Sequence, residues 1–165
     1  MNAGAVLGVD PGTRGGLAVL RAADARVLRV QAFTPGMTIS DLVRAVRAAV
    51  ETMPSEGGGE AYVERVGYIR GDGGRGAFTF GQVAGVISGT LFALGYPPRY
   101  VYPVTWQSRL DCLSGGNKNV TKRRAIELFP SVRVTHAVAD ALLIAEYGRR
   151  RMPAARFEAD LRQGL

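Results

Sequence analysis

The sequence predicts an α/β fold with a mixed five-stranded sheet, in which three antiparallel strands are followed by parallel strands, flanked by helices. Five apolar runs are candidate strands, at 6–9, 17–20, 27–33, 61–66 and 100–104. The first three follow one another through short turns, which is typical of an antiparallel meander. An uncharged stretch separates the last two, and this strand, helix, strand order predicts a parallel crossover.

Other segments have the spacing or the boundaries of helices. The first is capped by Thr38 or Ser40 and repeats apolar residues at helical spacing up to a loop that begins at Pro54. Two more are predicted at about 119–129, before a proline, and about 136–147, before a glycine. Trp106 begins a further helix, and we expect it to pack as core with its indole N–H bonded locally and with no chemical role.

The uncharged segment 77–98 is predicted to be a buried core helix rather than a membrane span. Glycine and polar residues dilute its hydrophobicity, and two prolines end it. Gly81, Gly85 and Gly89 recur every four residues and would give the helix one smooth face. Close packing of that face on the sheet is the default interpretation, and a helix across a two-fold dimer interface is the alternative.

Length and charge limit the classes of protein to which the chain can belong. At 165 residues and 47% hydrophobic content, we expect a single domain over 1–165. The formal net charge is +7, and all of the excess lies in 65–133. Such a concentrated surplus favours a nucleic-acid partner, with a solvated basic face as the alternative. The lone Cys112 excludes an internal disulfide, and the N-terminus lacks a secretory pattern, so a reducing cytoplasm is the predicted location.

Three acidic residues lie where a carboxylate is costly or projects from a sheet. Asp10 follows the first apolar run, and Glu64 lies near the end of the fourth. A turn aspartate and an edge-strand acid are the ordinary interpretations of these two. Asp140 lies within an otherwise apolar segment, where a buried carboxylate must be paired or bind a metal, and His136 lies one helical turn before it. Three converging carboxylates would suit Mg²⁺ ions that activate water against a phosphodiester.

Six motifs also occur in a fixed order along most of the chain. They are Gly8-Val9-Asp10-Pro11-Gly12-Thr13 with 16–18, Val63-Glu64-Arg65-Val66, 78–86, 104–107, Lys118 with 123–130, and 139–148. Together they resemble the RuvC family of Holliday junction resolvases, a branch of the RNase H-like nucleases, and especially its short phage and bacterial versions. The resemblance implies an RNase H-like fold and a homodimeric, metal-dependent endonuclease that nicks a four-way DNA junction symmetrically, without a membrane or a nucleotide cofactor.

The resemblance also implies a set of catalytic residues. Asp10, Glu64 and Asp140 match the metal-binding acids, with two Mg²⁺ ions expected per site and Mn²⁺ as the alternative. Asp10 is expected to bridge the ions, each of the other acids to complete one site, and Lys118 to stabilise charge on the phosphate. The family usually has another Asp, or sometimes His, just before the final aspartate. Here only His136 is available, as a metal ligand or as a proton-transfer group, so the chain departs from the common pattern.

Basic and aromatic side chains are predicted to contact DNA. They are Tyr68, Arg70, Arg75, Lys118, Lys122 and Arg123. The first three belong to a glycine-rich loop after Glu64, where the tyrosine is expected to stack on an unpaired base and the arginines to bind phosphates. The other three lie at a predicted helix start, where phosphate contact is favoured over a solvated face.

Three other functions stay open at this point. The first is an RNase H-like nuclease that acts on RNA or an RNA–DNA hybrid, which would use similar acids. The second is a sugar-kinase or actin-like ATPase, because Asp-Pro-Gly-Thr resembles the phosphate loop of that superfamily, although 165 residues cannot supply its two lobes. The third is a catalytically silent junction-binding module, which the missing fourth carboxylate would explain.

Overall fold

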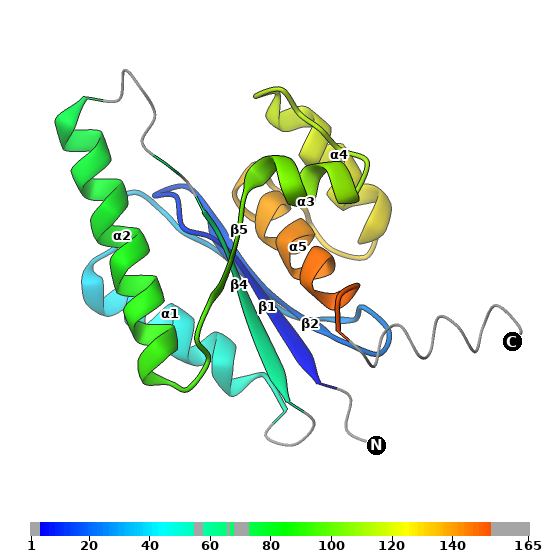
Figure 1. Cartoon of the computed structure of the whole chain (residues 1–165), viewed down its shortest axis with the longest axis horizontal. Coiled ribbons are helices and arrows are strands. Elements are labelled where there is room, and N and C mark those ends of the chain that lie inside the picture. The colour runs from blue at the N-terminus through cyan, green and yellow to red at the C-terminus, as the bar shows by residue number, and fades with distance from the viewer. Residues whose placement is uncertain (1–3, 55–57, 66, 68–72, 153–165) are drawn as a thin grey trace, which may run out of the picture.

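The computed structural model describes residues 4–54, 58–65, 67 and 73–152, which form a sheet with helices on both faces (Figure 1). The strands are β1 Ala5–Asp10, β2 Gly16–Arg21, β3 Val27–Ala32, β4 Gly59–Glu64 and β5 Arg99–Val101. The helices are α1 Ile39–Glu51, α2 Gly74–Ala93, α3 Pro103–Arg109, α4 Lys118–Leu128 and α5 His136–Arg149.

The sheet has the mixed topology that the sequence predicts. Its strand order is β3-β2-β1-β4-β5. The first three strands pair antiparallel, whereas β4 is parallel to both β1 and β5. The central strand β1 is buried at every residue, because strands flank it and helices cover both of its faces.

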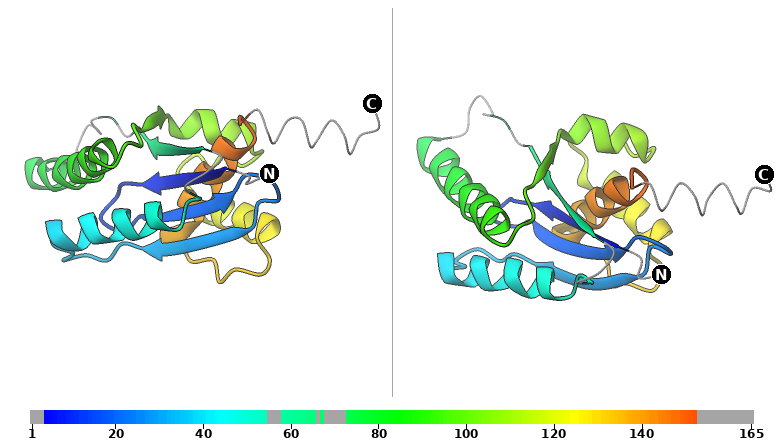
Figure 2. Two further views of the ribbon diagram at one scale, coloured as in Figure 1. Left: turned by 90° about the horizontal axis from the view of Figure 1, so that it is seen from below. Right: turned by 60° about the horizontal axis from the view of Figure 1, so that its bottom comes forward.

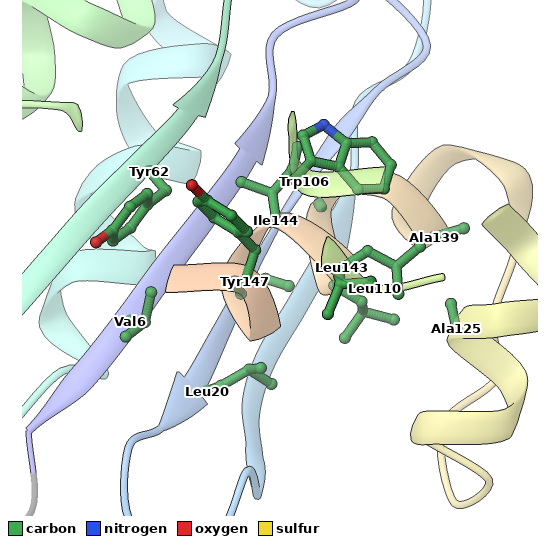
Figure 3. Packing of buried hydrophobic residues seen from close by; sticks show 14 of the residues in the cluster. Val6, Leu20, Tyr62, Trp106, Leu110, Ala125, Ala139, Leu143, Ile144 and Tyr147 are labelled. Carbon is green, nitrogen blue, oxygen red and sulfur yellow. The ribbon is translucent and has the colours of Figure 1, made fainter. Parts of the chain in front are cut away.

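Two hydrophobic clusters lie on opposite faces of the sheet. The first contains most of α5 together with Trp106 and Leu110 from the α3 region and Ala125 from α4 (Figure 3). The second packs α1 and one side of α2 against alternate residues of β1 and β2. Two further views show the same division, with α1 and α2 lying together on the side away from α5 (Figure 2). Successive side chains of a strand point to opposite faces, so the central strands supply both clusters.

Several predicted boundaries are corrected. The last strand ends at Val101 rather than at 104, because Pro103 lacks a backbone N–H for the sheet and instead starts α3. Thr38, not Ser40, caps α1, in a capping box with Asp41. The last helix continues two residues past its predicted end, to Arg149.

The prediction of a buried core helix over 77–98 is wrong. In α2 only Ile87 and Leu91 are buried, while Phe78 is 75% and Phe92 59% exposed. Its three regularly spaced glycines face open space, so the default interpretation of close packing on the sheet is also wrong. By length and composition α2 is long and apolar enough to cross a membrane, which for one helix is a weak indication.

Candidate active site

Two of the predicted acids meet at one edge of the sheet. The parallel pairing of β1 and β4 sets Val9 opposite Val63, so Asp10 and Glu64 end neighbouring strands side by side. Asp10 as a residue is only 9% exposed, and its Oδ1 accepts a hydrogen bond of 3.0 Å from the backbone N–H of Gly12. The tight turn after β1 therefore fixes this carboxylate through the backbone.

The third acid reaches this edge because α5 lies unusually close to β1. A Cβ atom at Gly8 would overlap the carbonyl oxygen of Ala141 and the backbone nitrogen of Ala145. Asp140 directly precedes Ala141, so the missing side chain at Gly8 lets the helix bring its aspartate toward Asp10. Burial raises the pKa of Asp10 most and the negative charge of Asp140 raises it further, so the two groups lie within electrostatic range.

All three acids line one groove with a volume of about 630 Å³. Its other lining residues come from α3, the following loop and α4, and are Pro103, Val104, Gln107, Leu113, Ser114, Gly115, Gly116, Lys118 and Thr121. Lys118 is exposed at the first turn of α4, within electrostatic range of all three acids. The groove thus combines buried and half-buried carboxylates with a solvent-accessible cation, a combination that suits a phosphate ester.

Burial makes the charged forms of the three acids costly. Burial, and then the charge of Asp10, raise the pKa of Glu64 to about 7. Burial also raises the pKa of Asp10 and of Asp140 above the usual range of an aspartate. The positive charge of Lys118 lowers the pKa of all three. Further positive charge in the groove would stabilise the ionised carboxylates.

The donor atoms fit a hard divalent cation. Oδ1 of Asp140 is buried and has no hydrogen-bond partner among the described residues, which leaves a carboxylate oxygen available as a ligand. No three His, Cys, Asp or Glu side chains within the described ranges are grouped closely enough to hold one ion. The carboxylate oxygens therefore match a divalent cation in their chemistry, but the three side chains would have to come closer together to share one ion.

Trp106 has a partner that the sequence did not predict. Its ring is fully buried in the α5 cluster, as expected, but Nε1 donates a hydrogen bond of 2.8 Å to Oε2 of Glu64, 42 residues away in the chain. The expectation of a local bond is wrong, because α3 lies over the carboxyl end of β4. The only sequence signal was the general need of a buried indole N–H for an acceptor.

Gln107, the next residue of α3, fixes the loop on another wall of the groove. Its Oε1 accepts hydrogen bonds of 3.1 Å from the backbone N–H of Ser114 and 3.2 Å from the Ser114 hydroxyl. Ser114 belongs to the short loop that leads to Lys118. Trp106 and Gln107, neighbours in α3, thus hold the Glu64 carboxylate and the loop that precedes Lys118.

The remaining predicted residues lie at different distances from this groove. His136 is exposed at the start of α5, within electrostatic range of Asp140, and it does not line the groove. Lys122 is half-buried, and Arg123 is exposed beside Glu127, with 3.9 Å between Nε and the carboxylate. Neither lines the groove.

The glycine-rich loop is only partly described. Tyr68 and Arg70 lie outside the described residues. Arg75 is exposed in the first turn of α2, because that helix begins at Gly74, so its placement in a loop is wrong. Its role in DNA contact stays a prediction.

The sheet order and the acids at its edge define an RNase H-like fold, as in RuvC. RuvC from T. thermophilus, in complex with a Holliday junction substrate, is 22% identical, with a TM-score of 0.69 over 91% of this chain and 96% of that one. Another Thermus thermophilus RuvC structure is 23% identical, with a TM-score of 0.65 over 93% and 96%. Ydc2, the yeast mitochondrial Holliday junction resolvase, is 17% identical, with a TM-score of 0.52 over 97% and 84%. No protein-family model and no curated protein matches the chain.

Proposed function

We propose that this chain is a metal-dependent endonuclease that nicks four-way DNA junctions in pairs and acts in the cytoplasm. The observation that carries the proposal is the single groove that Asp10, Glu64, Asp140 and Lys118 line together. The fold shared with structures of Holliday junction resolvases supports it, since one of them was determined with a junction substrate.

Each residue of the groove has a defined part in this chemistry. Asp10, Glu64 and Asp140 would hold Mg²⁺, or Mn²⁺ in its place, and these ions would supply Lewis-acid activation of water and neutralisation of phosphate charge. Lys118 binds the phosphate in the same groove and stabilises the charge that develops on it. His136, one turn from Asp140, is the candidate fourth ligand or proton-transfer group.

A homodimer would present two such grooves to a symmetric junction. The exposed side of α2 carries Phe78, Gly81, Gly85, Gly89 and Phe92, which fall on one helical face. An exposed apolar face of this length is characteristic of an interface, and a two-fold dimer would bury it against its own copy. DNA contact through Tyr68, Arg70, Arg75, Lys122 and Arg123 completes the proposal.

Cleavage of a labelled four-way junction tests the function directly. The junction is compared with matched linear duplex and RNA–DNA hybrid, in Mg²⁺, in Mn²⁺ and in EDTA. We expect paired nicks confined to the junction, no product in EDTA, and a loss of roughly 10³-fold in rate for Asp140→Asn, since a carboxylate that would hold the activating ions is removed. Junction affinity of this variant should be equal or higher, because repulsion of the phosphates falls.

Asp24→Asn is the matched control. Asp24 lies in an exposed turn and pairs with Arg21 away from the groove, so this variant should cleave at the wild-type rate. Preferential cleavage of the hybrid would replace the proposal with an RNase H-type activity. Tight junction binding without nicks in either metal would replace it with a binding module.

A further inference from the structure

The Trp106–Glu64 hydrogen bond links the core to the candidate metal site. Trp106 is the only tryptophan of the chain, and its side chain has no exposed surface. Its indole N–H donates a hydrogen bond of 2.8 Å to one carboxylate oxygen of Glu64, at the end of β4. A buried N–H can be satisfied by any carbonyl, so its use on a groove carboxylate requires a specific placement of α3.

The donor is held by a rigid support. Pro103 starts α3, and the fully buried Leu110, which directly follows its last residue, packs in the same cluster as Trp106. The Leu110 carbonyl in turn accepts a hydrogen bond of 2.8 Å from Nε of Arg124 on α4. The indole therefore has little freedom, whereas a glutamate at a strand end has three side-chain torsions to be fixed.

We propose that Trp106 is a positioning residue for Glu64: its N–H holds Oε2, so that Oε1 is directed at a divalent cation in the groove. The inference rests on the proposed function only in assigning a cation to these acids. Outer hydrogen bonds of this kind orient metal ligands in many sites. Trp106 itself touches neither the cation nor the DNA in this arrangement.

Replacing the N–H by sulfur tests the bond without changing the shape of the side chain. Because the chain has one tryptophan, incorporation of 3-benzothienylalanine in place of tryptophan alters position 106 alone. Mn²⁺ binding to the DNA-free protein is followed by electron paramagnetic resonance of the free ion. We expect the sulfur analogue to bind Mn²⁺ about tenfold more weakly, as for loss of an outer-shell partner. Junction affinity in EDTA should be unchanged.

Two further proteins separate positioning from packing. Leu20→Val opens a small cavity in the same cluster at the other end of the sheet, where Leu20 pairs with Val6 rather than with the residues at the groove, and its Mn²⁺ affinity should equal that of the wild type. In a Glu64→Gln background the sulfur analogue should alter residual Mn²⁺ affinity less than about twofold, because the coupling partner is gone. Trp106→Phe, with its unfolding measured alongside, should reproduce the loss.

The outcomes distinguish this inference from the proposed function. Unchanged Mn²⁺ affinity in the sulfur analogue, or a loss as large in the Glu64→Gln background, overturns the positioning role. Absence of Mn²⁺ binding that depends on Glu64 in the wild type overturns it as well. Coupled Mn²⁺ binding in a protein that nicks no junction would uphold the positioning role and reject the nuclease.

Discussion

Helices α2 and α5 have similar apolar sequences and opposite surroundings. Ten residues of α5 are buried, and they include Glu146, whose carboxylate is paired with Arg149 and Arg150. In the longer α2 only Ile87 and Leu91 are buried. One helix crosses the centre of the sheet, while the other lies beside α1 with one side uncovered (Figures 1 and 2). Apolar composition therefore does not distinguish a buried core helix from a helix with one exposed face.

Glycines contribute to this difference in opposite ways. Gly8 is on the strand beneath α5, where a Cβ atom would overlap the helix backbone. The missing Cβ therefore permits the close approach that brings Asp140 toward Asp10. Gly85 is on α2 itself, and a Cβ there would meet nothing within 4 Å. The same residue type thus marks a tight contact on one side of the molecule and an uncovered surface on the other.

The largest expected effect comes from closing the gap beneath α5. In Gly8→Ala the new methyl group would overlap backbone atoms of α5, so the helix must move away from β1. We expect this to lower the free energy of unfolding by about 3 kcal/mol. Urea denaturation measures it. Nicking should fall with it, because Asp140 moves away from Asp10. A loss below about 0.5 kcal/mol would show that α5 has room to shift.

The acids that line the groove should make the free energy of unfolding depend on pH. The pKa of Glu64 is raised to about 7 by burial, from an ordinary value of 4.5. As the pH rises between these two values, the Glu64 side chain ionises in the unfolded chain before it does in the folded one, so the free energy of unfolding falls. The full cost of ionising this carboxylate in the folded protein is present above pH 7. Glu64→Gln should therefore unfold with a free energy on the order of 2 kcal/mol higher than the wild type at pH 8.5, and with a smaller gain at pH 5.

Urea denaturation at both pH values checks this second prediction. Glu127→Gln makes the same change on the half-exposed surface of α4, and its effect should be small at both pH values. Addition of Mg²⁺ at pH 8.5 should raise the stability of the wild type and leave Glu64→Gln nearly unchanged. Equal gains for Glu64→Gln at the two pH values would show that Glu64 is not strained by burial.

The uncovered side of α2 should govern association. Phe92→Ser removes an aromatic side chain that is 59% exposed, and it should weaken self-association about tenfold with little change in monomer stability. Sedimentation velocity over a concentration series measures the dissociation constant. Ile39→Ser, at an exposed site on α1 of similar exposure, should leave association unchanged. If both variants associate as the wild type does, α2 is not the dimer surface.

The smallest effect is expected at Gly85. Gly85→Ala places a methyl group in open space and improves helix propensity, so the free energy of unfolding should rise by about 0.5–1 kcal/mol when measured at concentrations where the chain is monomeric. The sign is opposite to that of Gly8→Ala, which makes the two a matched pair. A loss of stability at Gly85 would mean that a contact of the monomer covers this face.

Much of the fold and one of the three acids could be predicted because their signals are local. Strands, turns and helical spacing are set by neighbouring residues, and a carboxylate inside an apolar segment stands out wherever the chain folds. Asp140 stood out in this way, whereas Asp10 and Glu64 had ordinary local interpretations and were selected through the resemblance to the RuvC family; the structure places all three in one groove. The mixed sheet was predicted from local signals and is confirmed.

Contacts between distant segments were decided only by the tertiary structure. The partner of Trp106 is 42 residues away, and nothing near the tryptophan in the chain indicates it. The exposure of α2 depends on which other elements pack against it. The hydropathy of α2 itself carries no information about those neighbours. Local sequence thus determined what each segment is, while packing determined which apolar faces meet, because burial is a property of pairs of surfaces.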